Sequence, residues 1–238
     1  MGIGKEFYDL MDKISYRFTD VSHLECALTH SSYSNEMKKR GFRVNSNESY
    51  EFLGDAVLEL IISEDLFLRC VGEGEGALTK YRQSLVCEST LAKIAENIDL
   101  GAYLNVGSSE ENTDVRRRAK VLADSLEALI AAVYLDSTKL GDTSSAKTVV
   151  LSLFDHEIDA VIKRGNTDYK SMLLQFVEKN SGSELRFEYR ESGPEHKKQF
   201  HATAYINNNV VGEGDGRTKR AAEMSAAKSA LMLFGISV

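Results

Sequence analysis

Three carboxylates stand at helical spacing in the first third of the chain. Glu48, Glu51 and Asp55 lie in a stretch with the period of an amphipathic helix, where they share one face. Glu51 and Asp55 are like charges four residues apart, which weakens an isolated helix. A divalent cation would offset this repulsion, and a ligand set made only of oxygen favours Mg²⁺ or Mn²⁺ over zinc. An ordinary helix with a solvated acidic face fits the same residues.

A second pair of acids lies in a strongly apolar stretch. Asp124 and Glu127 are three residues apart in a run of small and aliphatic residues that predicts another helix. Acids on such a helix are costly to bury unless they are paired or bind a metal ion. We therefore hypothesise that two helices, each with acids on one face, converge on one cation site.

Composition limits the class of protein that could carry such a site. The 238 residues are enough for one medium domain and one small domain, and the 42% hydrophobic content fits a soluble globular protein. No apolar run approaches the roughly 20 residues of a membrane helix, and the N-terminus lacks a secretion signal. Cys26, Cys70 and Cys87 have no metal-ligand spacing. We expect reduced thiols in a cytoplasmic protein with no membrane partner.

The charge is divided unevenly along the chain. Of 29 basic and 36 acidic side chains, residues 164–238 hold 11 and 9, which leaves 18 and 27 for residues 1–163. Residues 1–163 therefore carry −9 and residues 164–238 carry +2, so the acidity behind the net charge of −7 is confined to the first part of the chain. An acidic domain repels phosphate unless cations bridge the two. This division suits an acidic, cation-binding domain attached to a separate, mildly basic module.

The first part of the chain has helical period throughout. Helices are predicted at about residues 5–14, 21–28, 47–68, 77–86, 89–98, 117–135 and 146–162, with a basic exposed loop at 36–46. Asp20 is the expected N-cap of the second helix. His30 could act as a general base, but we favour a hydrogen-bonded structural residue beside a helix end. The prediction is an all-α domain at 1–163, followed by a linker at 164–167.

The last part of the chain changes period. Residues 169–179 read as a helix, and apolar residues then alternate with polar ones at 185–189 and 200–206. The three asparagines at 207–209 predict a turn before a third strand, and residues 219–234 form an alanine-rich helix. We predict a small α+β domain at 168–238 with the order α-β-β-β-α.

Four segments of the first domain resemble bacterial ribonuclease III, in the order found in that family. They are ALTHSS (27–32), NESYEFLGDAVL (47–58), EGALTK (75–80) and LADSLEALIAAVYLD (122–136). The second domain, with GPEHKKQF (193–200) and GDGRTKR (214–220), resembles a double-stranded RNA-binding domain. The resemblance covers nearly the whole chain.

The resemblance implies a divalent-metal-dependent endoribonuclease that hydrolyses both strands of double-stranded RNA. The ends would be 5′-phosphate and 3′-hydroxyl with short 3′ overhangs, the metal Mg²⁺ or Mn²⁺, and the assembly a homodimer with one centre per subunit. No small-molecule cofactor is expected. Processing of ribosomal, messenger and transfer RNA precursors would be the cellular role. The rival interpretation is a regulator that binds duplex RNA without cutting it, which loss of an acid would have indicated.

The same resemblance assigns residues to roles. The expected catalytic acids are Glu48, Glu51, Asp55, Glu75, Asp124 and Glu127. Metal ligands among them would be Glu51, Asp55, Asp124 and Glu127, with Glu127 and then Asp55 most important for turnover. Expected RNA-binding residues are Ser171, Gln175, His196, Arg217, Lys219 and Arg220. The last three stand at a helix N-terminus, which already favours phosphate.

Three positions leave alternatives open. Phe52 would insert into the partner subunit of a homodimer, or it is an intrachain core residue. Leu174 stands where related domains carry glutamine, which puts one minor-groove contact of that helix in doubt. The basic run before Asp124, which is Arg116, Arg117, Arg118 and Lys120, either steers phosphate or only solubilises a helix start.

Overall fold

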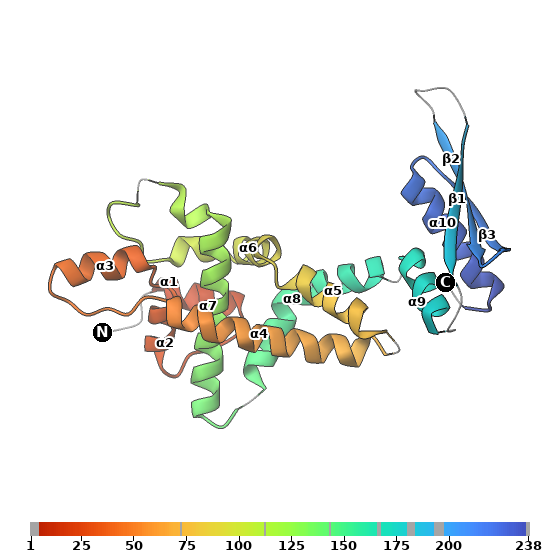
Figure 1. The fold of residues 1–238 in the computed structure, drawn as a ribbon. Helices are drawn as coiled ribbons and strands as arrows, with labels where there is room; N and C mark the ends of the chain where they lie inside the picture. Colours follow the sequence, from red (N-terminus) through yellow and green to blue (C-terminus); the bar gives the residue numbers. More distant parts are fainter. Residues whose placement is uncertain are drawn as a thin grey trace. The chain divides into compact units, whose positions relative to one another are not determined.

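The computed structural model describes residues 5–236 except 72, 112, 143, 166–167, 180–183 and 193–197. The chain separates into two compact units, with the division between residues 162 and 163 (Figure 1). The first unit is helical and the second is a three-stranded sheet with two helices, so both predicted fold classes are confirmed.

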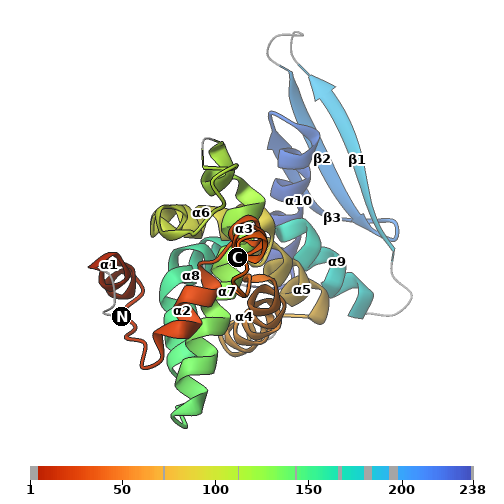
Figure 2. The same ribbon diagram turned by 90° about the vertical axis from the view of Figure 1, so that its left-hand side faces the viewer.

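The first unit consists of eight α-helices and two short 3₁₀ helices in the described part of the chain. The helices are α1 (Lys5–Lys13), α2 (Val21–Ala27), α3 (Ser31–Lys39), α4 (Glu48–Arg69), α5 (Glu75–Leu85), α6 (Glu88–Asn97), η1 (Leu100–Tyr103), η2 (Asp114–Arg117), α7 (Ala119–Lys139) and α8 (Ser145–Gly165). Helix α7 is the core helix, because residues 128–133 are each at most 2% exposed. A helix that is apolar on all sides must be covered on all sides. Helix α4 crosses it in Figure 1 and lies beside it, seen nearly end-on, in Figure 2.

Three predicted boundaries in this unit were wrong. The predicted loop at 36–46 begins later, because α3 continues to Lys39. Arg117 belongs to η2 rather than to the core helix, which starts at Ala119 and continues to Lys139. The last helix extends three residues beyond the predicted 162, to Gly165. Helix α3 lacks an apolar stripe, so periodicity could not reveal it.

A buried carboxylate fastens the N-terminal segment to the core helix. Asp136 of α7 is 1% exposed. It accepts hydrogen bonds from the Tyr16 hydroxyl at 2.8 Å and from the backbone N–H groups of Thr19 and Asp20 at 2.9 and 2.7 Å. Asp20 in turn caps α2 by accepting from the backbone of Ser22 at 3.2 Å, as predicted. Buried carboxylates persist where such donors replace water.

The second unit follows the predicted α-β-β-β-α order. Its elements are α9 (Tyr169–Lys179), β1 (Leu185–Ser192), β2 (Gln199–Ile206), β3 (Asn209–Gly216) and α10 (Lys219–Leu233). The strands pair antiparallel in the order β1-β2-β3. Helix α10 lies directly against β3, since a Cβ atom on Gly212, Gly214 or Gly216 would lie 2.2 to 2.5 Å from its backbone. The three glycines thereby place the first turn of α10 close to the end of the strand.

Two further observations bear on the cellular expectations. The three cysteines are free thiols. Among the described residues, no helix has both the length and the apolarity needed to cross a bilayer.

Candidate active site

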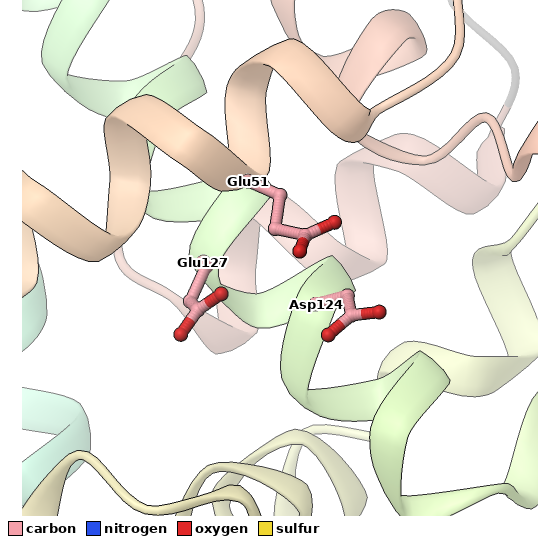
Figure 3. Close-up of side chains that lie close together, drawn as sticks. All are labelled: Glu51, Asp124 and Glu127. Carbon is pink, nitrogen blue, oxygen red and sulfur yellow. The ribbon is translucent and has the colours of Figure 1, made fainter.

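Three of the expected acids meet between α4 and α7. Glu51 comes from α4, and Asp124 and Glu127 come from α7 (Figure 3). One carboxylate oxygen of each lies within 4.8 Å of the others, and all three side chains are half-buried. In the described part of the chain, no other group of three His, Cys, Asp or Glu side chains lies close enough to share an ion. We call these residues the acidic cluster.

Gly54 brings the two helices close enough to form the cluster. A Cβ atom at this position would lie 1.9 Å from the carbonyl oxygen of Glu127 and 2.5 Å from its carbonyl carbon. The backbones of α4 and α7 therefore touch at Gly54, between Glu51 and Asp55 in the sequence. Sequence reasoning missed this residue, although a glycine inside a strongly helical pattern is a signal of close packing.

Burial and mutual repulsion make the charged forms of these acids less stable. Burial, followed by the charges of Asp55, Glu51 and Asp124, raises the pKa of Glu127 from 4.5 to about 7. Burial and then the charge of Asp124 also raise the pKa of Glu51. Carboxylates held together against their repulsion, with raised pKa values, are typical of a functional site that binds a cation.

The first turn of α10 presents cations in the second unit. Lys219 and Arg220 are exposed there, and Arg217 is exposed just before the helix; Thr218 caps the helix by accepting from the backbone of Ala221 at 3.1 Å. The Lys219 ammonium lies 3.4 Å from Glu191. It also lies 5.7 and 5.9 Å from the ring centres of Tyr189 and Phe200. An uncovered helix N-terminus with three cations is suited to phosphate.

Comparison with known proteins agrees with both units. The family model for ribonuclease-III-like domains matches residues 20–154, and the double-stranded RNA binding motif matches residues 169–232. Ribonuclease 3 of Natranaerobius thermophilus is 43% identical over 229 residues, which cover 94% of this chain and 96% of that protein. The chain belongs to the ribonuclease III family. It is an endoribonuclease of double-stranded RNA.

Other ribonuclease III proteins and structures extend the match. Ribonuclease 3 of Caldanaerobacter subterraneus is 42% identical, covering 95% of this chain and 97% of that protein. The crystal structure of the ribonuclease III nuclease domain from Campylobacter jejuni is 36% identical with a TM-score of 0.56, covering 64% of this chain and 96% of that one. A second structure of that nuclease domain has a TM-score of 0.55 at 36% identity, covering 62% of this chain and 95% of that one.

The remaining expected acids are not among the three that converge. Asp55 is exposed, and its charge comes first among the charges that raise the pKa of Glu127. Glu48 opens α4 and accepts a hydrogen bond from the Ser46 hydroxyl at 2.8 Å. Glu48, Glu51 and Asp124 line a pocket of about 520 Å³, together with Arg118 and Lys120.

Glu75 is not brought into the cluster within one chain. It is the first residue of α5 and accepts a hydrogen bond from the Thr79 hydroxyl at 3.4 Å. It lines a separate pocket of about 450 Å³ with Phe67, Leu78 and Arg82, among others. Within one chain, Glu75 therefore lies apart from the acidic cluster.

The basic run before Asp124 divides into two kinds of residue. Arg116 donates to the carbonyl of Gly101 at 3.4 Å and to that of Leu104, so it holds the end of η1. Lys120 reaches forward one turn and pairs with Asp124 at 3.1 Å. His30 caps α3, since its Nδ1 accepts from the backbone of Ser32 at 3.3 Å, which confirms the structural interpretation.

Phe52 points away from the core of its own chain. It is 82% exposed, although it lies between Glu51 and Gly54 at the crossing of the core helices. Further along α4, Leu60 and Phe67 are each 69% exposed, and Val71, just past the end of the helix at Arg69, is 88% exposed. The spacing of Leu60 and Phe67 puts them with Phe52 on one outward stripe of the helix. The alternative of an intrachain core residue is therefore wrong.

The remaining RNA-binding predictions lie on α9 or outside the described residues. Ser171 donates its hydroxyl hydrogen to Asp168 at 2.9 Å, and Gln175 is half-buried one turn later. Leu174 is 45% exposed, in keeping with an apolar replacement on an accessible face. His196 lies outside the described residues.

Proposed function

We propose that the acidic cluster binds divalent metal and that the chain uses it to hydrolyse phosphodiester bonds in both strands of duplex RNA. The observation that supports this is the convergence of three carboxylates within 4.8 Å, with the pKa of Glu127 raised to about 7. Repulsion of this size is costly unless a cation offsets it when the site is at work.

The donor set fits a hard cation. The cluster offers only carboxylate oxygens, which suit Mg²⁺ or Mn²⁺ and not zinc. Glu51, Asp55, Asp124 and Glu127 would hold the ion. When bound, Mg²⁺ lowers the pKa of a coordinated water and stabilises charge on phosphate oxygens.

The chain's own residues would orient the substrate and the attacking water. The pKa of about 7 belongs to Glu127 without metal; a bound cation would hold Glu127 as a carboxylate, which could orient the attacking water by accepting a hydrogen bond from it. Arg118 and Lys120 line the pocket beside the cluster and would neutralise phosphate there. Attack of water at phosphorus with departure of the 3′-oxygen leaves 5′-phosphate and 3′-hydroxyl ends.

The second unit would supply the grip on the duplex. The first turn of α10 would bind phosphates across the narrow major groove, and α9 would contact the minor groove through Ser171 and Gln175. Recognition of this kind depends on A-form shape and on 2′-hydroxyl groups rather than on sequence. The chemistry and the binding then belong to separate units of the chain.

Two strands require two centres, which a homodimer provides. The exposed stripe of α4 that begins at Phe52 is the apolar surface available for a second copy. The second solved Campylobacter jejuni nuclease domain has a flexible region described as involved in dimer formation. The pocket formed by Phe67, Glu75, Leu78 and Arg82 would accept the partner's Phe52. Short 3′ overhangs would follow from two staggered cuts, and structured RNA precursors are the expected substrates.

Cleavage of a long, perfect RNA duplex tests this proposal. Wild type, Glu127→Gln and Glu157→Gln would each be assayed with Mg²⁺ and with chelator, alongside a gel-shift assay. Glu157 is a matched control, because it is a half-buried acid of α8 outside the cluster, paired with Lys93 at 2.8 Å. We expect Mg²⁺-dependent cutting by wild type and Glu157→Gln, and binding without cutting by Glu127→Gln. If wild type with Mg²⁺ binds the duplex but does not cut it, the result would instead support the rival interpretation, a regulator that binds duplex RNA without cutting it.

A further inference from the structure

Lys120 is a cation that lies beside the acidic cluster and contacts one of its acids. It is the second residue of α7, one helical turn before Asp124. Its Nζ lies 3.2 Å from one carboxylate oxygen of Asp124 and 3.1 Å from the other. Asp124 is one of the three residues whose oxygens converge in the acidic cluster. The ammonium therefore contacts both oxygens of a carboxylate that a metal ion would also need as a ligand.

The influence of Lys120 extends beyond Asp124. The hydrogen bond to Asp124, followed by the charge of Asp124, raises the pKa of Lys120, and the charge of Glu51 adds to this. In return, the positive charge of Lys120 opposes the rise in the pKa values of Glu51 and Glu127. The lysine thus interacts with all three acids of the cluster.

Only one acid of this centre has such a partner in the described part of the chain. Asp124 has the ion pair with Lys120, whereas Glu51, Asp55 and Glu127 have none. The Lys120 side chain is also 71% exposed, while that of Asp124 is 24% exposed. A long, accessible side chain can leave the carboxylate without disturbing the packing of α7, which a buried lysine could not do.

We propose that Lys120 is a resident counter-ion of the acidic cluster, which divalent metal must displace from Asp124 in order to bind, so that Lys120 sets the metal affinity of the centre. This inference rests on the proposed function of the cluster as a metal site. Two effects act in the same direction. The ion must break the pair with Asp124, and it then remains close to a displaced positive charge.

The size of the effect follows from electrostatics. A single charge about 5 Å from a divalent ion changes the affinity by roughly tenfold even at the dielectric constant of water. The exposed lysine can move away into solvent, which reduces this value. We therefore expect Lys120→Met to tighten metal binding by about three- to tenfold. Methionine keeps the length and the helix propensity of lysine and removes only the charge.

Calorimetric titration of the full chain with Mn²⁺ alone, without RNA, tests the inference. The matched control is Lys139→Met, because Lys139 lies on the same helix, is 65% exposed, and pairs with Asp20 at 3.2 Å far from the cluster. We expect tighter binding by Lys120→Met, and wild-type affinity for Lys139→Met and for Lys120→Arg, which keeps the charge. In chelator, the melting temperature of Lys120→Met should be lower than that of wild type, and its gain with Mn²⁺ should be larger.

The outcomes separate the inference from the proposed function. Glu127→Gln is included to show that the heat of Mn²⁺ binding comes from the cluster. If wild type binds Mn²⁺ and Glu127→Gln does not, but Lys120→Met binds no more tightly than wild type, only the inference is overturned. If wild type binds no Mn²⁺ at all, the proposed metal site and the inference both fail.

Discussion

The raised pKa of Glu127 means that the acidic cluster destabilises the metal-free protein. A carboxyl group whose pKa is higher in the folded state favours folding while it is protonated, and this contribution is lost as pH rises from 4.5 through about 7. Glu127→Gln removes the charge and keeps the shape. We therefore expect the variant, which should be inactive, to be more stable than wild type at pH 8 in chelator.

The magnitude follows from the two pKa values. The step from 4.5 to about 7 corresponds, at about 1.36 kcal/mol per pKa unit, to about 3 kcal/mol without solvent screening. Glu127 is only half-buried, and solvent screens its charge, so we expect about 1–2 kcal/mol. For a domain of this size, that gain corresponds to a rise of roughly 2–8 °C in melting temperature.

Scanning calorimetry of the full chain at pH 5 and pH 8, with chelator, measures this difference. The transition of residues 163–238 serves as an internal reference, because that unit lacks Glu127. Glu157→Gln is a control of opposite sign, since the hydrogen bond from Lys93 contributes to a lowered pKa of Glu157 and stabilises its charged form. Added Mn²⁺ should raise the melting temperature of wild type and leave Glu127→Gln unchanged.

Two results would refute this reasoning. One is a Glu127→Gln variant that melts at or below wild type at pH 8 in chelator. The other is a gain in melting temperature that is the same at pH 5 and pH 8, because repulsion between charges must weaken as the acids become protonated.

Three further predictions concern other parts of the structure. Gly54→Ala should push α4 away from α7, lower the free energy of unfolding by about 1–3 kcal/mol and abolish Mn²⁺ binding. Gly76→Ala is the control, because Gly76 has open space around it, and this variant should keep wild-type stability and Mn²⁺ binding. Equal calorimetric behaviour of the two variants would contradict the role of Gly54. Phe52→Asp should yield monomers in sedimentation experiments and lose double-strand cutting; a stable dimer would exclude the α4 stripe as the interface. Lys219→Ala should weaken duplex binding and reduce the slope of log affinity against log salt by about 1; an unchanged slope would mean that Lys219 contacts no phosphate.

Sequence patterns predicted the parts of the structure that depend on local geometry. Helix α9 has the predicted bounds, Tyr169–Lys179, because its apolar residues follow a helical period between clear breaks. The pairing of acids on each helix face also followed from spacing alone. The meeting of the two faces did not, because it depends on the contact between Gly54 and the backbone of Glu127, residues far apart in the sequence.

Other features were beyond the reach of sequence patterns because tertiary contacts decide them. Helix α3 is polar, and it is held by contacts from outside itself, such as that of Glu36 with the backbone of Ser108 at 2.6 Å. Lys120 belongs to a basic run that reads equally as a phosphate guide or a soluble helix start. Only the side-chain geometry shows that it pairs with Asp124.

The three glycines of β3 determine where along the strand α10 packs. Along the strand, Gly212 faces Ala226 and Ala230, and Gly216 faces Ala222. Two strand residues advance by about 6.6 Å and four helical residues by about 6 Å, so the two repeats are nearly commensurate. The repeat of glycines on the strand therefore matches the spacing of the α10 residues that pack on it. The close contact at Gly216 thus fixes the start of α10, and with it the exposed cations Lys219 and Arg220, against the end of β3.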